Sequence, residues 1–201
     1  MTATTVPTRL NLGGQKGDHP RLPGWHVVDL RDGADTQADI ATDTLPYADG
    51  SIDVVFTSHT LEHVPIDRLE FVLSEIRRVL KPDGLLRVLV PDMALALDAY
   101  LNSDIGYFRS VDLTYHDPST PIGGLIRSFA HSVSSVGNGH VNSFTEQSLT
   151  WWLDRAGFEQ IERSKFNKST DEELRTPGFD RSPELSLIIE ARAPSVDGAA
   201  P

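Results

Sequence analysis

Apolar residues form short continuous runs along this chain, each bounded by turn residues. Such runs predict strands at Thr8–Leu12, Trp25–Leu30, Ile52–Ser58 and Leu85–Val90, with a very short strand at Ala38–Ile40. The runs IDVVFTS and LLRVLV are almost wholly apolar, which is typical of parallel strands covered on both faces. The sequence therefore predicts a sheet whose central strands are buried.

A second pattern, with apolar residues at three- and four-residue steps, predicts a helix between the last two of these strands. It is carried by Leu69, Val72, Leu73, Ile76, Val79 and Leu80. Pro65 suits the first turn of this helix, and Lys81-Pro82-Asp83-Gly84 ends it. Met93–Leu101 predicts a further helix.

The C-terminal part of the chain predicts one more helix and two strands. The helix is expected over Phe144–Ala156, with a capping box of Ser143 and Glu146 at its start and Gly157 at its end. Phe158–Lys165 and Leu185–Ala191 follow as strands. Between the helices, the glycine- and proline-rich residues 102–142 predict an irregular segment that acts as a lid or substrate segment.

This order of elements predicts one domain over residues 1–193, followed by a disordered tail at 194–201. Strands that alternate with helices favour a doubly wound α/β sheet with helices on both faces. In such a sheet the ligand lies at the carboxyl ends of the strands. Gly13-Gly14, Asp29, Asp39 and Ser58-His59 all lie at or just beyond these ends, so we expect them to converge on one site.

Composition and charge restrict the classes of partner. The formal net charge is −11 and no Lys/Arg cluster is present, which argues against a nucleic-acid partner. The chain has no cysteine, which excludes disulfides and thiolate chemistry. Residues 1–7 lack the apolar core of a signal peptide, and no apolar run is long enough to cross a bilayer. We therefore expect a cytoplasmic protein without a membrane partner.

The glycine turn and the acid after the second strand suit a nucleotide-like ligand, but the space between them leaves little room for a helix. A dinucleotide pyrophosphate normally lies on such a helix. S-adenosylmethionine (SAM) has no phosphate, and it needs close backbone approach at the glycines and an acid for its ribose diol. Asp29 suits the diol. Asp39 can accept from the adenine amino group with the Ile40 amide as donor to the ring, and Asp43 competes with Asp39 for this role.

Four motifs in order give a family resemblance: LNLGG, ADIATDTLPYADGSIDVVFTSHTLEHV, EIRRVLKPDG and LLRVLVPD. Over residues 8–92 the chain resembles a class I SAM-dependent methyltransferase, close to the methyltransferase type 11 domain. The resemblance implies a Rossmann-like, mostly parallel seven-stranded sheet with an antiparallel last strand. It also implies SAM contacts at Gly13, Gly14, Asp29, Leu30, Asp39, Ile40, Ser58 and His59, with S-adenosylhomocysteine as the product. The glycine motif departs from the family pattern, with Asn11 near the acidic place and Gly17 as third glycine.

Methyl transfer to a hydroxyl or amine also requires removal of a proton, and histidine is the natural base near neutral pH. His59 and His63 follow the IDVVFTS strand, and His140 precedes the last helix, so these three are the candidate catalytic residues. His116-Asp117 and His140 are of the types that can supply ligands to a divalent ion. Because they lack the fixed spacing of a metal motif, we expect no metal.

The sequence thus predicts an enzyme that methylates a small molecule, such as a sugar or specialised metabolite, on oxygen or nitrogen rather than carbon. A catalytically inactive methyltransferase-like binding partner is the first alternative, and a nucleotide-dependent oxidoreductase is the second. Trp151 lies beside Trp152 on the last helix, so the two cannot share one face. We expect Trp151 to be the exposed one and a candidate anchor of a homodimer.

Overall fold

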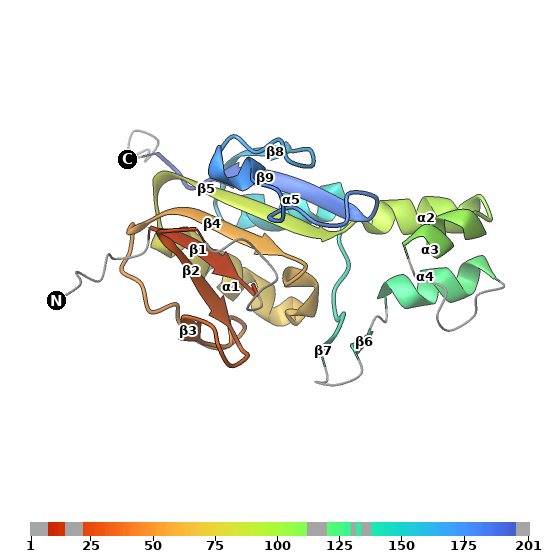
Figure 1. Cartoon of the computed structure of the whole chain (residues 1–201), viewed down its shortest axis with the longest axis horizontal. Coiled ribbons are helices and arrows are strands. Elements are labelled where there is room, and N and C mark those ends of the chain that lie inside the picture. The colour runs from red at the N-terminus through yellow and green to blue at the C-terminus, as the bar shows by residue number, and fades with distance from the viewer. Residues whose placement is uncertain (1–7, 15–21, 112–119, 130–131, 134–137, 196–201) are drawn as a thin grey trace.

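The computed structural model describes residues 8–14, 22–111, 120–129, 132–133 and 138–195. Its centre is a seven-stranded sheet in the order β3-β2-β1-β4-β5-β9-β8 (Figure 1). Strands β1 to β5 pair in parallel, whereas β9 is antiparallel to both β5 and β8. The expected Rossmann-like, mostly parallel sheet with an antiparallel last strand is therefore confirmed.

The elements follow the predicted order along the chain. The strands are β1 Arg9–Leu12, β2 Trp25–Asp29, β3 Thr36–Gln37, β4 Ile52–Ser58, β5 Leu80–Pro91, β6 Ser132–Val133, β7 Asn138–Gly139, β8 Glu159–Arg163 and β9 Ser186–Arg192. The α-helices are α1 Leu69–Val79, α2 Met93–Leu101, α3 Ile105–Ser110, α4 Pro121–Phe129 and α5 Glu146–Arg155. Single 3-10 turns lie at Leu61–His63, Ile66–Arg68 and Glu173–Arg175. Among the described residues, no helix is long and apolar enough to cross a membrane.

The two faces of the sheet are covered differently. The apolar stripe of α1 and Leu149 and Leu153 of α5 pack on one face, against residues such as Val55 and Val88. On the other face, Leu174 and Phe179 pack against Phe56. In the described part of the chain, a coil with a 3-10 turn thus covers the face where a second layer of helices was expected. The Phe179 ring of this coil fills the space over the sheet, with its centroid 5.3 Å from that of the Phe56 ring.

Several boundaries differ from the sequence prediction. β5 begins at Leu80 rather than Leu85, so Leu80 belongs to the strand and not to the preceding helix. The third strand is Thr36–Gln37 rather than Ala38–Ile40, because the Asp39 carbonyl accepts from the Thr42 and Asp43 amides and closes a turn there. The capping box of α5 pairs Thr145 with Ser148, not Ser143 with Glu146. Glu146 instead forms an ion pair with Arg163, 2.8 Å away. The expected end of this helix is confirmed, since Gly157 has a φ of +82°.

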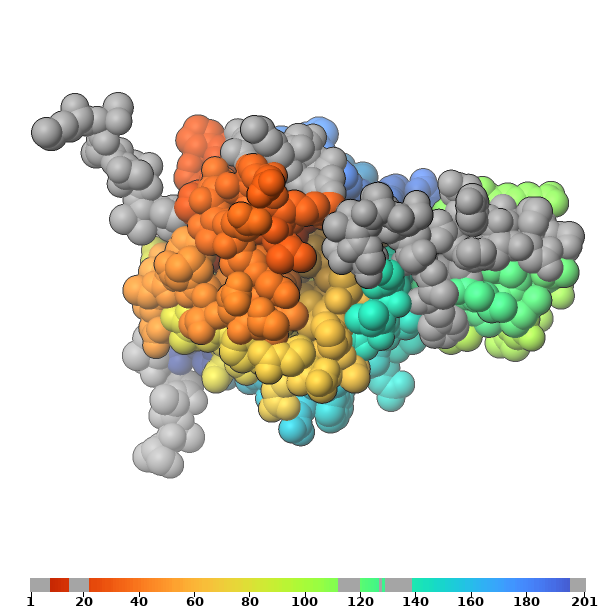
Figure 2. Space-filling model, turned by 90° about the horizontal axis from the view of Figure 1, so that it is seen from below, coloured from red at the N-terminus to blue at the C-terminus, as the bar shows by residue number. Residues whose placement is uncertain are grey.

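The expectation of an irregular segment over residues 102–142 is wrong for much of its described part. Helices α3 and α4 fold against α2 around Phe108, which is fully buried. A methyl group at Gly124 would lie 2.2 Å from the Phe108 ring, so this glycine allows close helix packing rather than disorder. Together, α2, α3 and α4 form a helical lobe that projects beyond the sheet (Figures 1 and 2).

Candidate functional site

The carboxyl ends of β1, β2 and β4 lie side by side because these strands are parallel neighbours. The turn after β1 is held by the Gly13 amide, which donates to the Val28 carbonyl of β2 at 2.8 Å. Gly13 has a φ of +75°, a conformation that favours glycine. The adjacent turn after β4 supplies Thr60, whose side chain occupies the space where a Gly13 side chain would lie.

Substitution Gly13→Ala is expected to lower the free energy of unfolding by about 2–3 kcal/mol, through left-handed strain and a clash. The added methyl would lie 2.1 Å from Thr60 Oγ1, so the two turns must separate. Urea denaturation measures the loss. Gly24→Ala is the matched control, because Gly24 has a φ of +86° but open space around it. Equal losses in the two variants would contradict the role assigned to Thr60.

Asp29 ends β2 beside this glycine turn, and it is only 5% exposed. One carboxylate oxygen accepts from the Arg31 amide at 2.8 Å and from Arg31 Nε at 3.2 Å. The other oxygen, Oδ2, is buried and has no hydrogen-bond donor among the described residues. A buried carboxylate oxygen without a donor is costly unless a ligand hydroxyl or amine supplies one.

Asp39 and Asp43 take different parts in the turn after β3. Asp43 accepts from the Asp39 amide at 2.9 Å, so it closes the turn. Asp39 Oδ1 accepts from the Ala41 amide, and the Asp39 side chain is half-buried. Ile40 follows directly, and Leu30 is 50% exposed just beyond β2. This favours Asp39 over Asp43 as the residue free to contact a ligand from the turn.

Unpaired buried oxygens gather at this edge of the sheet. In the described part of the chain, eight buried side-chain atoms lack a hydrogen-bond partner, and six of them lie here: Asn11 Oδ1, Asp29 Oδ2, Thr57 Oγ1, Ser58 Oγ and both oxygens of Glu62. They belong to the last residues of β1, β2 and β4 and to the 3-10 turn after β4. Native proteins pair nearly all such groups, so this concentration points to a polar ligand.

The three candidate catalytic histidines also meet at this edge. His59 Nδ1 lies 3.5 Å from Glu62 Oε1, and His140 Nε2 lies 3.9 Å from the same oxygen. The rings of His63 and His140 touch edge to face, with centroids 4.9 Å apart. Glu62 is only 1% exposed. Sequence reasoning missed this carboxylate, although it lies in the quoted LEHV motif, because nothing local in the sequence shows that it is buried.

His59 is held in a fixed orientation at the end of β4. Its φ is 51°, which is uncommon for a residue other than glycine. Its amide donates to the Leu89 carbonyl, and its Nε2 lies 2.9 Å from Ser186 Oγ. Left-handed strain of this kind is concentrated at functional sites, where the surrounding structure maintains it.

Tyr107 brings a further polar group from the helical lobe. The pKa of the Tyr107 phenol is raised to about 12, first by burial and second by the nearby Asp92 carboxylate. Its hydroxyl is buried without a hydrogen-bond partner in the described residues. At neutral pH this hydroxyl is therefore protonated and can donate to an acceptor molecule.

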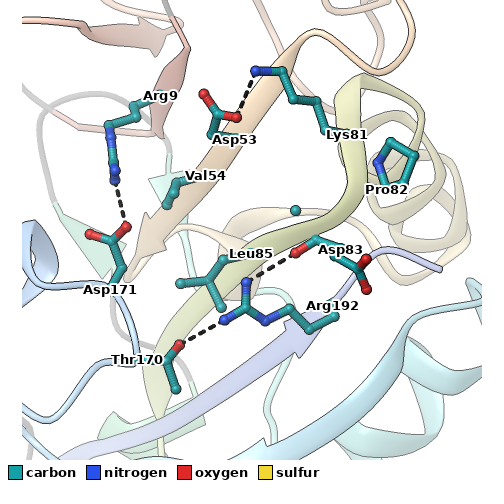
Figure 3. A pocket seen from close by; sticks show the side chains of 11 residues that line it. Arg9, Asp53, Val54, Lys81, Pro82, Asp83, Leu85, Thr170, Asp171 and Arg192 are labelled. Carbon is teal, nitrogen blue, oxygen red and sulfur yellow. Dashed lines mark hydrogen bonds and ion pairs between the residues drawn. The ribbon is translucent and has the colours of Figure 1, made fainter. Parts of the chain in front are cut away.

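A cavity of about 410 Å³ lies at the opposite edge of the sheet, where β1, β4 and β5 begin (Figure 3). Most of its polar lining already has partners within the protein. Lys81 Nζ lies 2.6 Å from Asp53, Arg9 lies 2.8 Å from Asp171, and Arg192 donates to the Asp83 carbonyl and the Thr170 hydroxyl. Because these side chains are already engaged, this cavity offers less chemistry than the carboxyl edge.

Several candidates from the sequence lie outside the described residues, namely Gly17, His116 and Asp117. The same holds for residues 15–21 between the first two strands and for 196–201 of the tail. Trp151 is 53% exposed, as expected, while Trp152 packs partly buried against the core.

Residues 26–88 match the model of a family described as a methyltransferase domain. No curated protein sequence matches this chain significantly. The fold is similar to that of a SAM-dependent methyltransferase from Archaeoglobus fulgidus, with a TM-score of 0.54 and 15% identity over 94% of this chain and 86% of that one. The expected resemblance to a class I methyltransferase, in domain and in fold, is therefore confirmed.

Two larger methyltransferases contain the same fold. The apo SAM-dependent methyltransferase SibL has a TM-score of 0.52 and 18% identity over 95% of this chain and 51% of that one. Human N-acetylserotonin methyltransferase, solved in complex with SAM, has a TM-score of 0.52 and 15% identity over 94% and 48%. This chain thus spans about half the length of either protein.

Proposed function

We propose that this chain, with its methyltransferase domain, is an active SAM-dependent enzyme that methylates a small molecule on oxygen or nitrogen. The observation that carries the proposal is the concentration of unpaired buried oxygens at the carboxyl ends of β1, β2 and β4. An adenosyl group offers hydroxyl and amino donors that match these acceptors. The methyltransferase match over residues 26–88 and the fold support the same cofactor.

Asp29 is the residue that would hold the ribose of SAM. Its Oδ2 lacks a donor in the described structure, and its other oxygen is fixed by Arg31. The turn of Gly13 and Gly14 lies beside it and would contact SAM through its backbone, while the space of a side chain at these glycines is taken by Thr60 and Asn11. Asp39 and the Ile40 amide would contact the adenine, and the exposed Leu30 side chain would cover its face. Ser58 and His59 would border the sulfonium end.

SAM bound here would supply an activated methyl group, so the protein would mainly align the acceptor and accept its proton. Transfer to oxygen or nitrogen would give S-adenosylhomocysteine, with the electron pair of the broken S–CH₃ bond on sulfur. His59, His63 and His140 surround Glu62 and are the candidates to take the acceptor proton. A carboxylate beside an imidazole stabilises the imidazolium that results.

The helical lobe of α2, α3 and α4 would cover the acceptor from above the carboxyl edge. We assign this role to residues 102–142, which continue the lobe after α2. The lobe begins directly after β5, and Tyr107 of α3 carries a protonated hydroxyl. We also propose a cytoplasmic location with neither nucleic acid nor membrane as partner. The exposed Trp151 is the candidate anchor of a homodimer.

Calorimetry with SAM, S-adenosylhomocysteine and NAD(H) tests the proposed function. We expect SAM and S-adenosylhomocysteine to bind with one molecule per chain, and labelled methyl groups to pass to an acceptor from a metabolite panel. NAD(H) should not bind, because its pyrophosphate normally lies on a helix N-terminus and the sequence between the first two strands leaves little room for a helix. Absence of binding by both SAM and S-adenosylhomocysteine would instead favour a binding partner without catalysis, and binding of NAD(H) alone would favour an oxidoreductase.

A further inference from the structure

We propose that Glu62, His63 and His140 bind a first-row divalent cation such as Zn²⁺ or Fe²⁺. Each of the three residues offers one ligand atom, and these atoms lie within 4.8 Å of one another. Two imidazole nitrogens and one carboxylate oxygen suit these cations, whereas Mg²⁺ and Ca²⁺ prefer oxygen ligands. The cation's part in methyl transfer would rest on the proposed function, but its binding would not.

The strongest observation is the state of Glu62. Its side chain is 1% exposed, and neither carboxylate oxygen has a hydrogen-bond donor among the described residues. An isolated buried carboxylate costs several kcal/mol, which proteins offset with a paired charge or a metal ion. Within 4 Å of it lie two imidazole nitrogens, His59 Nδ1 at 3.5 Å and His140 Nε2 at 3.9 Å, and neither is hydrogen-bonded to it. A cation bound by one carboxylate oxygen and the imidazoles would neutralise this buried charge.

The two histidines are oriented as metal ligands commonly are. His63 Nδ1 lies 3.2 Å from the Gly139 carbonyl, and His140 Nδ1 lies 3.5 Å from the Ser128 carbonyl. A carbonyl can only accept, so Nδ1 carries the proton in each ring and the lone pair is left on Nε2. This arrangement, a backbone acceptor that fixes the tautomer, is the usual support of a metal-binding imidazole.

The backbone joins the two halves of the cluster. The Val141 and Asn142 amides donate to the Glu62 carbonyl at 2.8 and 3.0 Å, and Asn142 Nδ2 donates to the Val64 carbonyl at 2.5 Å. His140 is thereby fixed against the turn that carries Glu62 and His63. A tetrahedral ion with bonds of about 2.1 Å holds its ligands about 3.4 Å apart. Since the ligand atoms lie within 4.8 Å of one another, binding requires a contraction of at most about 1.4 Å, within reach of side-chain rotation.

With three ligands from the described residues, a tetrahedral cation would keep a coordination position for a further ligand. It borders the carboxyl edge at which the acceptor would lie, because Glu62 follows β4 by only four residues. A cation in this position could hold an acceptor hydroxyl and lower its pKa. His59, with Nδ1 at 3.5 Å from Glu62, would then remain to take the proton.

Titration of the chelator-treated chain of 201 residues with CoCl₂ and ZnCl₂ tests the proposal in the absence of SAM. We expect one tight ion per chain and visible absorption bands of Co²⁺ bound to nitrogen and oxygen. Glu62→Gln and His140→Ala should each weaken this affinity by about 10–100-fold. His63→Asn provides a second histidine variant if His140→Ala does not fold, and circular dichroism checks the fold of each.

Glu159→Gln and His26→Gln are the matched controls, since each changes the same residue type outside the cluster. Both should bind cobalt as the original chain does. The proposal is overturned if the original chain binds no ion tightly, or if Glu62→Gln binds as tightly as the chain with Glu62. Because this titration contains no SAM and the SAM calorimetry needs no cation, either proposal can fail while the other stands.

Discussion

Replacing Asp29 by alanine is expected to weaken SAM binding by about 100-fold, because two hydrogen bonds to one carboxylate are lost, together worth about 3 kcal/mol. The carboxylate is almost fully buried; Oδ1 is fixed by Arg31, and Oδ2 has no hydrogen-bond partner in the part of the chain that the structure describes. A diol bound to it would gain charge-assisted hydrogen bonds shielded from water. Isothermal calorimetry with SAM and S-adenosylhomocysteine measures the loss, which should be similar for both because they share the ribose.

Asp32→Ala is the control for this variant, since it removes the same charge three residues away on an exposed part of the chain. SAM should bind this control with the affinity of the original protein. A thermal melt shows whether Asp29→Ala still folds. If the folded Asp29→Ala variant binds SAM within twofold of the original, the ribose does not lie on Asp29.

The second large effect concerns stability and lies away from the site. Arg87, in the centre of β5, is completely buried. Its guanidinium donates to Asp180 at 2.5 and 3.0 Å and to Glu190 at 2.8 Å. We expect Arg87→Met to lower the free energy of unfolding by about 3–5 kcal/mol, because it leaves two acidic groups buried without a counter-charge. Urea denaturation followed by circular dichroism measures the change.

The control is Arg155→Met, which removes an ion pair with Glu70 in which both side chains are about half exposed. Exposed pairs contribute about 1 kcal/mol or less, so this variant should be nearly neutral. Arg87→Lys should lie between the two, since it keeps the charge but cannot donate to both acids in the same geometry. A loss below about 1 kcal/mol in Arg87→Met would mean that the buried network contributes little.

Prediction from the sequence worked where the physical cause is local. The apolar run IDVVFTS and the apolar periodicity from Leu69 to Val79 depend only on which residues of a single element face the core. The sequence therefore predicts the bounds of β4 and α1 closely. Prediction from the sequence is wrong at residues 102–142, where the glycines favour an irregular segment but the structure has helices α3 and α4. There Gly124 serves the contact with Phe108, and only the folded lobe reveals that contact.

Charged residues inside two of the apolar runs show the same limit of prediction from sequence. Arg87 in LLRVLV and Glu190 in LSLIIEA lie on neighbouring strands and point to the same buried face. There the two side chains form an ion pair. Each strand was predicted from its apolar neighbours, but nothing in either run indicates the partner. The pairing depends on the register of β5 against β9, which is set by the whole sheet.

The sequence by itself determined the α/β class, the order of the main strands and the edge of the sheet at which Gly13, Asp29 and His59 lie. These follow from periodicity and from turns that a few consecutive residues specify. The tertiary structure alone decided that Glu62 is buried and that His140, far along the chain, lies beside it. Burial and proximity of this kind arise only when distant segments pack together. Here the amides of Val141 and Asn142 donate to the Glu62 carbonyl, and these hydrogen bonds bring the two segments side by side.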